Sequence, residues 1–194
     1  MTFCYRGLDM IHRKPKVLSS KIVHKNPWYQ VRRDRLIWPN GAPGDYFVME
    51  NPDAAIVIVE NKNKLLTVEQ YRYPTDHISL EFCMGALENK EGIIKGAQRE
   101  LLEETGYEAK RLQKIGSFDV MNGVIRHQMH VLVAKGLTPK KHPNRETSEY
   151  DLRIKWIPIK TWRTLIAKGK IRDAASLSAW TIYQEWKTTK KDSP

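Results

Sequence analysis

Residues 85–107 read GALENKEGIIKGAQRELLEETGY, and this stretch decides how the rest of the chain is interpreted. No proline occurs between Ile93 and Thr105, and Ala97 and Leu101 are among the apolar positions, so the segment predicts a helix over 93–105. Gly106 follows the last helical position, where a glycine commonly ends a helix. The stretch therefore predicts a helix with a defined C-terminal end.

Three carboxylates of this helix, those of Glu100, Glu103 and Glu104, lie at positions i, i+3 and i+4 and share one face. Like charges so placed repel by about 0.2–0.5 kcal/mol per pair on an exposed helix, and a bridging cation converts that cost into affinity. Hard carboxylate oxygen ligands suit Mg²⁺, with Mn²⁺ as a substitute. The alternative is a solvated acidic face. We expect Arg99 and Glu91 to form an ion pair that orients the preceding loop.

The composition of the chain excludes several classes of protein. Its 194 residues suffice for one domain with an appendage, and no run of about 18 apolar residues would span a membrane. The first residues lack the apolar segment of a secretory signal, and with only Cys4 and Cys83 present we expect a reducing, cytoplasmic location. The net charge of +11 would attract polyanions, but without a nucleic-acid-binding signature we interpret it as a basic soluble surface.

The first 50 residues are expected to form a separate unit. Residues 18–50 alternate as three short antiparallel strands, with a turn at PNGAPG, and Asn51-Pro52-Asp53 separates them from the next apolar segment. Three such strands cannot bury both faces alone, so they need a partner surface. We therefore expect residues 1–50 to form a tail and strand unit, and residues 51–194 the main domain.

The main domain alternates between strands and helices. Strands are expected at 54–60 and 64–72, then at about 110–120 and 124–134 with a hairpin turn at Asn122-Gly123, and finally at 152–159. Two helices close the chain, one at about 160–168 and one after Asp173, a candidate N-cap. This order predicts an α+β fold in which a mixed sheet lies between helices.

The spacing of glycine, glutamate and arginine within residues 85–106 resembles the Nudix box, the signature of hydrolases that cleave a diphosphate linked to a nucleoside and a second group. Other stretches resemble the ADP-ribose pyrophosphatase and nucleoside-diphosphate-sugar hydrolase branch: VEQYRYP and SLEFCMG, NPWYQVRRDRLIWPNGAPGDYFVME, and GKIRDAASLSAW. Together they cover most of residues 18–187. Tyr107, Lys90 and Cys83-Met84 depart from the usual pattern. The resemblance implies the Nudix fold, an α/β/α sandwich around a mixed sheet.

The resemblance also implies a set of metal ligands. In that branch the metals are held by the first and last glutamates of the box and by a backbone carbonyl just before its glycine. Carried over, these are Glu100, Glu104 and the carbonyl of Met84, with Glu103 assisting. Glu103 and Glu104 are therefore expected among the catalytic groups as well.

The general base of the branch often comes from the loop before the last strand. Here that loop offers Glu146, Glu149 and Asp151, and we choose Glu149. Solvated loop carboxylates are the alternative, and in that case a box glutamate would serve.

Substrate contacts implied by the resemblance come from both units. Arg72 would lie near the diphosphate, and Glu81 would contact the metal's water or the substrate. Residues 18–50 would be exchanged between the subunits of a homodimer, where Trp28 would either stack on the nucleobase or pack the dimer interface. The alternative for Arg72 is a surface arginine at a strand end.

The function that the sequence favours is Mg²⁺-dependent hydrolysis of ADP-ribose or a related nucleoside diphosphate sugar to a nucleoside monophosphate and a sugar phosphate. A second hypothesis keeps the chemistry and changes the substrate to a dinucleoside polyphosphate, coenzyme A or a 5′-RNA end. A third is a non-catalytic nucleotide-binding module, against which the complete set of box glutamates argues. No membrane or nucleic-acid partner is expected.

Overall fold

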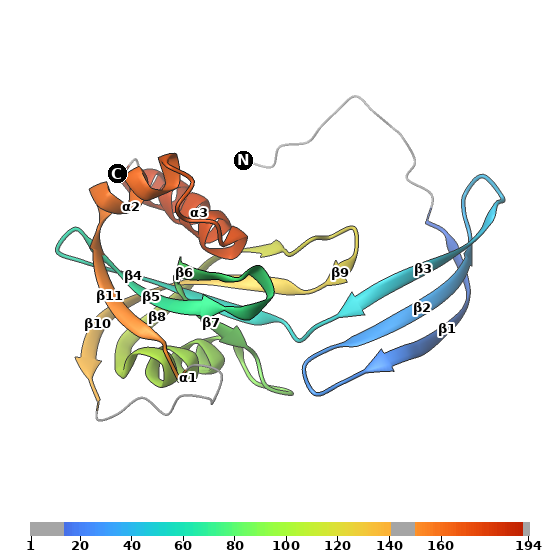
Figure 1. Ribbon diagram of the computed structural model, residues 1–194, viewed down its shortest axis with the longest axis horizontal. Helices are drawn as coiled ribbons and strands as arrows, with labels where there is room; N and C mark the ends of the chain where they lie inside the picture. The colour runs from blue at the N-terminus through green and yellow to red at the C-terminus, as the bar shows by residue number, and fades with distance from the viewer. Residues whose placement is uncertain (1–13, 141–149, 192–194) are drawn as a thin grey trace. The chain divides into compact units, whose positions relative to one another are not determined.

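The computed structural model describes residues 14–140 and 150–191, which fall into two compact units (Figure 1). The first unit contains the described residues up to Asn51 together with Gly123–Ile125, and the second contains the other described residues. Within the described ranges, no helix is both long enough and apolar enough to cross a membrane.

The first unit is an antiparallel sheet. Its strands are β1 (Lys16–Lys25), β2 (Gln30–Ile37), β3 (Pro43–Glu50) and the short β9 (Ile125–Arg126), hydrogen-bonded in that order. The β1–β2 turn is fixed by Asn26, whose side-chain oxygen accepts hydrogen bonds from the backbone N–H groups of Trp28 and Tyr29, both at 2.9 Å. The three strands expected within residues 18–50 are therefore present.

One strand expected from the sequence, at 124–134, is divided between two sheets. Its first residues form β9 beside β3, where the Met49 N–H donates to the Val124 carbonyl at 3.0 Å and the Tyr46 hydroxyl donates to the Gly123 carbonyl. Its later residues belong to β10 (Gln128–Pro139) in the second unit. The prediction of one continuous strand was wrong because the free edge of β3 binds the Gly123–Ile125 segment.

The second unit contains a mixed sheet in the order β11-β5-β4-β10-β8, with β6 paired to β5 and β7 paired to β4. Its strands are β4 (Ala54–Asn61), β5 (Lys64–Arg72), β6 (His77–Glu81), β7 (Cys83–Ala86), β8 (Tyr107–Asp119), β10 and β11 (Arg153–Pro158). A short 3₁₀ turn, η1 (Tyr73–Thr75), joins β5 to β6. The strands β4 and β10 run parallel, and the pairs β8–β10 and β5–β11 are antiparallel.

Helices cover both faces of this sheet (Figure 1). Because side chains alternate along a strand, Ile56 and Ile58 of β4 pack in a cluster with Trp162 of α2 (Ile159–Ala167) and with residues of α3 (Ala174–Lys191). Val57 points the other way, into a cluster with Leu101 of α1 (Ile93–Thr105). Burying side chains of this size contributes about 1.5–3 kcal/mol each. The predicted α+β fold, with a mixed sheet between helices, is confirmed.

The helix ends also follow the sequence. Gly106 ends α1 in the left-handed conformation, φ +69°, and its N–H donates to the Leu102 carbonyl at 2.8 Å. At the start of α3 the Asp173 carboxylate accepts a hydrogen bond from the Ser176 N–H at 2.7 Å, as an N-cap does.

Candidate active site

Helix α1 lies against β7 because position 85 carries no side chain. A Cβ atom on Gly85 would stand 2.0 Å from the carboxyl carbon of Glu100, far inside van der Waals contact. Glu100 is only 8% exposed, so its carboxylate is confined to the space that glycine leaves. Any side chain at position 85 would displace Glu100 or push α1 away from the sheet.

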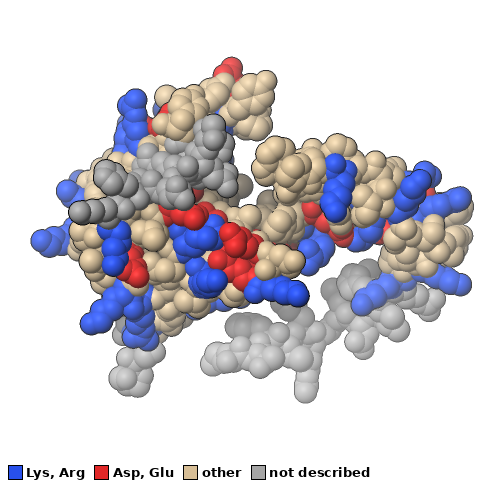
Figure 2. Space-filling model, turned by 90° about the horizontal axis from the view of Figure 1, so that it is seen from below, with Lys and Arg blue, Asp and Glu red and all other residues tan. Residues whose placement is uncertain are grey.

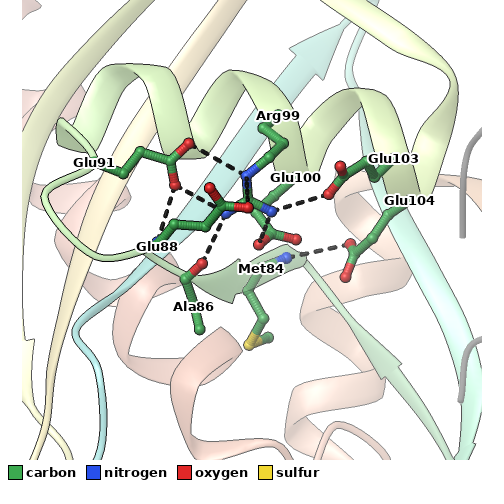
Figure 3. A network of polar contacts seen from close by, with 8 residues as sticks. All are labelled: Met84, Ala86, Glu88, Glu91, Arg99, Glu100, Glu103 and Glu104. Atoms are coloured by element: carbon green, nitrogen blue, oxygen red, sulfur yellow. Dashed lines mark hydrogen bonds and ion pairs between the residues drawn. The ribbon is translucent and has the colours of Figure 1, made fainter. Parts of the chain in front are cut away.

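A second glutamate of α1 is tied to the same strand. The Glu104 carboxylate accepts a hydrogen bond from the backbone N–H of Met84 at 3.2 Å, and this side chain is 3% exposed. Figure 3 shows the carboxylates of Glu100, Glu103 and Glu104 on the side of α1 that faces Met84. The three carboxylates expected to share one face of the helix therefore do so, one turn apart at most.

Arg99 connects these carboxylates to the loop before the helix. Its Nη1 donates to Glu100 at 2.7 Å and to Glu103 at 2.9 Å, while its Nη2 donates to Glu91 and to the Ala86 carbonyl, each at 2.9 Å (Figure 3). The ion pair predicted between Arg99 and Glu91 is thus present. The hydrogen bond from Arg99 holds the pKa of Glu91 below its ordinary value, and the pKa of Arg99 is raised in return.

The donor set of this region fits a hard divalent cation. Carboxylate oxygens from one helix face stand beside a strand whose backbone lies against them at Met84 and Gly85, which is the ligand type that Mg²⁺ prefers. Among residues 14–140 and 150–191, no three acidic, histidine or cysteine side chains already converge as a metal cluster. The reason is geometric: Arg99 draws Glu100 and Glu103 towards its own guanidinium, whereas Glu104 bonds to Met84.

Arg72 and Glu81, both expected to contact substrate, contact each other. The Nε of Arg72 donates to Glu81 at 2.9 Å, and its Nη2 donates to the other oxygen of the same carboxylate. Glu81 is 3% exposed, and the hydrogen bond to it raises the pKa of Arg72, with a smaller contribution from the nearby charge of Glu104. The guanidinium is therefore held near the acidic face of α1 in one orientation.

The remaining expected residues lie elsewhere. Trp28 belongs to the first unit, in the β1–β2 turn, with 72% of its surface exposed. Glu149 and Glu146 lie outside the described residues. The other acidic residue of that loop, Asp151, accepts a hydrogen bond from the Tyr71 N–H at 2.9 Å, which brings the end of the loop to β5.

Charge on the α1 side of the molecule is mixed. In Figure 2, acidic side chains gather in the middle of the face and basic side chains surround them. The net charge of +11 therefore does not exclude a local acidic patch that could bind cations.

The sequence analysis predicted only the contact of Arg99 with Glu91 and missed its contacts with Glu100, Glu103 and Ala86. Its bond to Glu103 has the i, i+4 spacing that favours helical ion pairs, so that contact had a signal. Its bond to the Ala86 carbonyl had none, because it depends on where β7 ends beside the helix.

These features define a class of protein, the α/β/α sandwiches that carry an acidic helix packed against a glycine of the adjoining strand. The NUDIX domain profile matches residues 49–179, and the chain belongs to the Nudix family. A second profile, that of the nucleoside diphosphate sugar hydrolase N-terminal domain, matches residues 15–49.

Individual relatives extend this assignment. The chain is 33% identical over 128 residues to the methanol dehydrogenase activator of Bacillus methanolicus, covering 66% of this chain and 69% of the relative. It is 29% identical over 142 residues to the ADP-ribose pyrophosphatase of Bacillus subtilis (strain 168), covering 73% and 77%. A crystal structure of an ADP compounds hydrolase superposes with a TM-score of 0.81 at 23% identity, over 92% of this chain and 96% of the other, which shows a shared fold.

Proposed function

We propose that this protein hydrolyses the diphosphate of ADP-ribose or a related nucleoside diphosphate sugar, with Mg²⁺ as its cation, and releases a nucleoside monophosphate and a sugar phosphate. The observation that carries the proposal is the buried pair of carboxylates, Glu100 and Glu104, against the strand at Gly85 and Met84. A solvated acidic helix face would not bury two carboxylates at 8% and 3% exposure. The N-terminal profile and the pyrophosphatase relatives favour a nucleotide sugar as substrate.

The proposal gives each site residue of the second unit a separate role. Glu100, Glu104 and the carbonyl of Met84 would hold the cation, with Glu103 completing the set. When bound, the cation neutralises the charge of the diphosphate and polarises a phosphorus–oxygen bond. Arg99 fixes the rotamers of Glu100 and Glu103 and ties them to the loop through Glu91.

Arg72 would bind diphosphate oxygens, since a guanidinium can donate two parallel hydrogen bonds to an oxyanion. Glu81 already fixes the plane of that guanidinium, so little conformational freedom is lost when the substrate binds. Glu149 would accept the proton of the water that attacks phosphorus, and the sugar phosphate or the nucleoside monophosphate would leave.

The proposal includes a homodimer formed through residues 1–50. Strand β1 is exposed along its whole length and forms one edge of its sheet, and it carries Val17, Leu18, Ile22 and Val23 at 41–56% exposure. An edge with such side chains is a ready surface for a second strand or sheet. Within the dimer, Trp28 would stack on the nucleobase.

The test is an assay of the purified protein with Mg²⁺ against ADP-ribose, GDP-mannose, UDP-glucose, diadenosine polyphosphates, coenzyme A and 5′-triphosphate RNA. We expect ADP-ribose to give AMP and ribose 5-phosphate, and EDTA to abolish the reaction. Cleavage restricted to polyphosphates, coenzyme A or RNA would contradict the substrate class. An absence of any cleavage, by a protein that binds these nucleotides, would favour a nucleotide-binding module.

A further inference from the structure

A cavity of about 280 Å³ lies in the second unit, between η1, the strand β6 and the start of α3. Its lining includes Arg72 and Glu81 as well as Arg172 and Asp173. Pockets that take a whole drug-sized ligand measure about 300–1,000 Å³, so this one suits a single moiety of a nucleotide sugar. Apart from Arg72 and Glu81, none of the residues that line the cavity has a role in the function proposed above.

The cavity offers hydrogen-bonding groups with free capacity. Ser79 is 5% exposed, and no other described residue hydrogen-bonds its hydroxyl. The Nδ1 of His77 lies 3.1 Å from the Thr75 carbonyl, which can only accept, so Nδ1 is the donor of this contact and Nε2 is left to bind a ligand. Arg172, whose side chain is exposed, forms no ion pair with another described residue and supplies donors.

This mixture distinguishes a hydroxyl-bearing ligand from a phosphate. A phosphate is charged and mainly accepts hydrogen bonds at neutral pH, and it would meet the carboxylates of Glu81 and Asp173. A sugar hydroxyl both donates and accepts, so it can satisfy Ser79, His77 and Arg172 together. The lining holds two arginines and two carboxylates, whose formal charges cancel, so the cavity is close to neutral. The two carboxylates already accept hydrogen bonds, Glu81 from Arg72 and Asp173 from the Ser176 N–H.

The cavity is also placed to continue the substrate. Arg72, which we propose to bind the diphosphate, also lines the cavity. A group attached to the diphosphate could therefore occupy the cavity while the diphosphate stays bound to Arg72. We propose that this cavity is the sugar pocket of the enzyme, in which Ser79, His77 and Arg172 bind the hydroxyl groups of the sugar on the distal phosphate. The inference rests on the proposed function and makes these three residues determinants of specificity for the sugar.

The experiment compares ADP-ribose with the methyl ester of ADP, which keeps the diphosphate and lacks the distal sugar. Both substrates are assayed with the wild type and with the Ser79→Ala and Arg172→Ala variants. Each variant should lose about tenfold in kcat/KM on ADP-ribose and less than twofold on the methyl ester, since one hydrogen bond to the sugar is removed. Arg111→Ala, which removes an exposed arginine of β8 outside the cavity, should change neither value.

Calorimetric titration of ribose 5-phosphate with Mg²⁺ into the same four proteins separates the two ways of failing. Equal losses on both substrates, or no loss on either, would overturn the sugar pocket while leaving the proposed function standing. Hydrolysis of neither substrate, with ribose 5-phosphate binding that weakens in Ser79→Ala and Arg172→Ala, would overturn the proposed function alone. Absence of both hydrolysis and binding would overturn both.

Discussion

Strands β1 and β4 both carry several apolar side chains but bury them to opposite extents. All ten residues of β1, KVLSSKIVHK, are exposed, whereas the first six residues of β4, AAIVIV, are buried. The difference follows from position, because β4 lies in the middle of a sheet with helices on both faces and β1 forms the edge of a sheet without helices. The second unit therefore buries its own hydrophobic core, whereas the apolar side chains of β1 in the first unit stay exposed.

One ion pair from each unit shows a second difference. In the first unit Arg33 pairs with Asp45 at the surface, where solvent screens the attraction and the pair contributes little to stability. In the second unit Arg99 binds Glu91, whose side chain is 4% exposed, and two further carboxylates. The Arg33–Asp45 pair joins the neighbouring strands β2 and β3, whereas the Arg99 contacts fix the carboxylates of the candidate active site. Four predictions test this division of labour.

The largest effect is expected at Glu104, if the catalytic chemistry belongs to the second unit. Glu104→Gln keeps the size of the side chain and removes a proposed cation ligand, so kcat should fall about 10³-fold or more, equivalent to about 4 kcal/mol. Initial rates with ADP-ribose and Mg²⁺ measure this, and thermal unfolding should be nearly unchanged. Glu108→Gln, which changes a half-exposed glutamate of β8, is the matched control. Near-normal turnover of Glu104→Gln would refute the metal assignment.

Truncating an apolar side chain to alanine should lower the free energy of unfolding much more in the second unit than in the first. Leu101→Ala empties a fully buried position of the second unit and should cost about 2–5 kcal/mol in unfolding free energy. Ile22→Ala, on exposed β1, should change the unfolding of the second unit by less than about 0.5 kcal/mol. Urea denaturation followed by circular dichroism gives both values. Comparable losses in the two variants would show that β1 is part of the same core.

Trp28 tests whether the first unit contributes to substrate binding at all. Trp28→Ala should raise KM for ADP-ribose by a factor equivalent to about 1–3 kcal/mol and leave kcat within about twofold, because stacking on the base holds substrate and transition state equally. Trp28→Phe, which retains an aromatic ring, should recover much of the affinity. An unchanged KM together with a dimer that dissociates in sedimentation would assign Trp28 to the interface instead.

The smallest effect is a pH dependence from Glu91. Its pKa is lowered in the folded protein, so the stabilisation is fully present above its ordinary value of 4.5 and is lost as the pH falls through the lowered value. Glu91→Gln should cost about 1 kcal/mol at pH 7, and the gap between variant and wild type should close in acid. Unfolding curves at pH 3 to 7 measure it. A constant gap would mean that the ion pair with Arg99 does not stabilise the fold.

Local signals in the sequence predicted α1 well and its surroundings less well. The expected bounds of 93–105 agree with the helix Ile93–Thr105, because a glycine on each side and an apolar stripe act over short range. The strands β6 and β7 were not predicted, since they are only five and four residues long and are held by pairing with β5 and β4. Their alignment depends on contacts that no local pattern encodes.

The site residues divide along the same line. The shared face of the box glutamates and the Arg99–Glu91 pair could be predicted from helix spacing and resemblance. The contact of Arg72 with Glu81 could not, because it requires the register of the β5–β6 hairpin, in which Arg72 stands opposite His77. The role of Trp28 stays a prediction for a similar reason, since it depends on surfaces beyond its own turn.

The parallel pairing of β4 with β10 has a consequence for biosynthesis. Ala54 pairs with Met129, 75 positions later, so the centre of the sheet cannot close until both segments have left the ribosome. At about 5–20 residues per second, this interval is on the order of 4–15 seconds. During that time the apolar residues of β4 have been synthesised but cannot yet pair with β10. We therefore expect chaperones that bind extended apolar segments to bind this nascent chain.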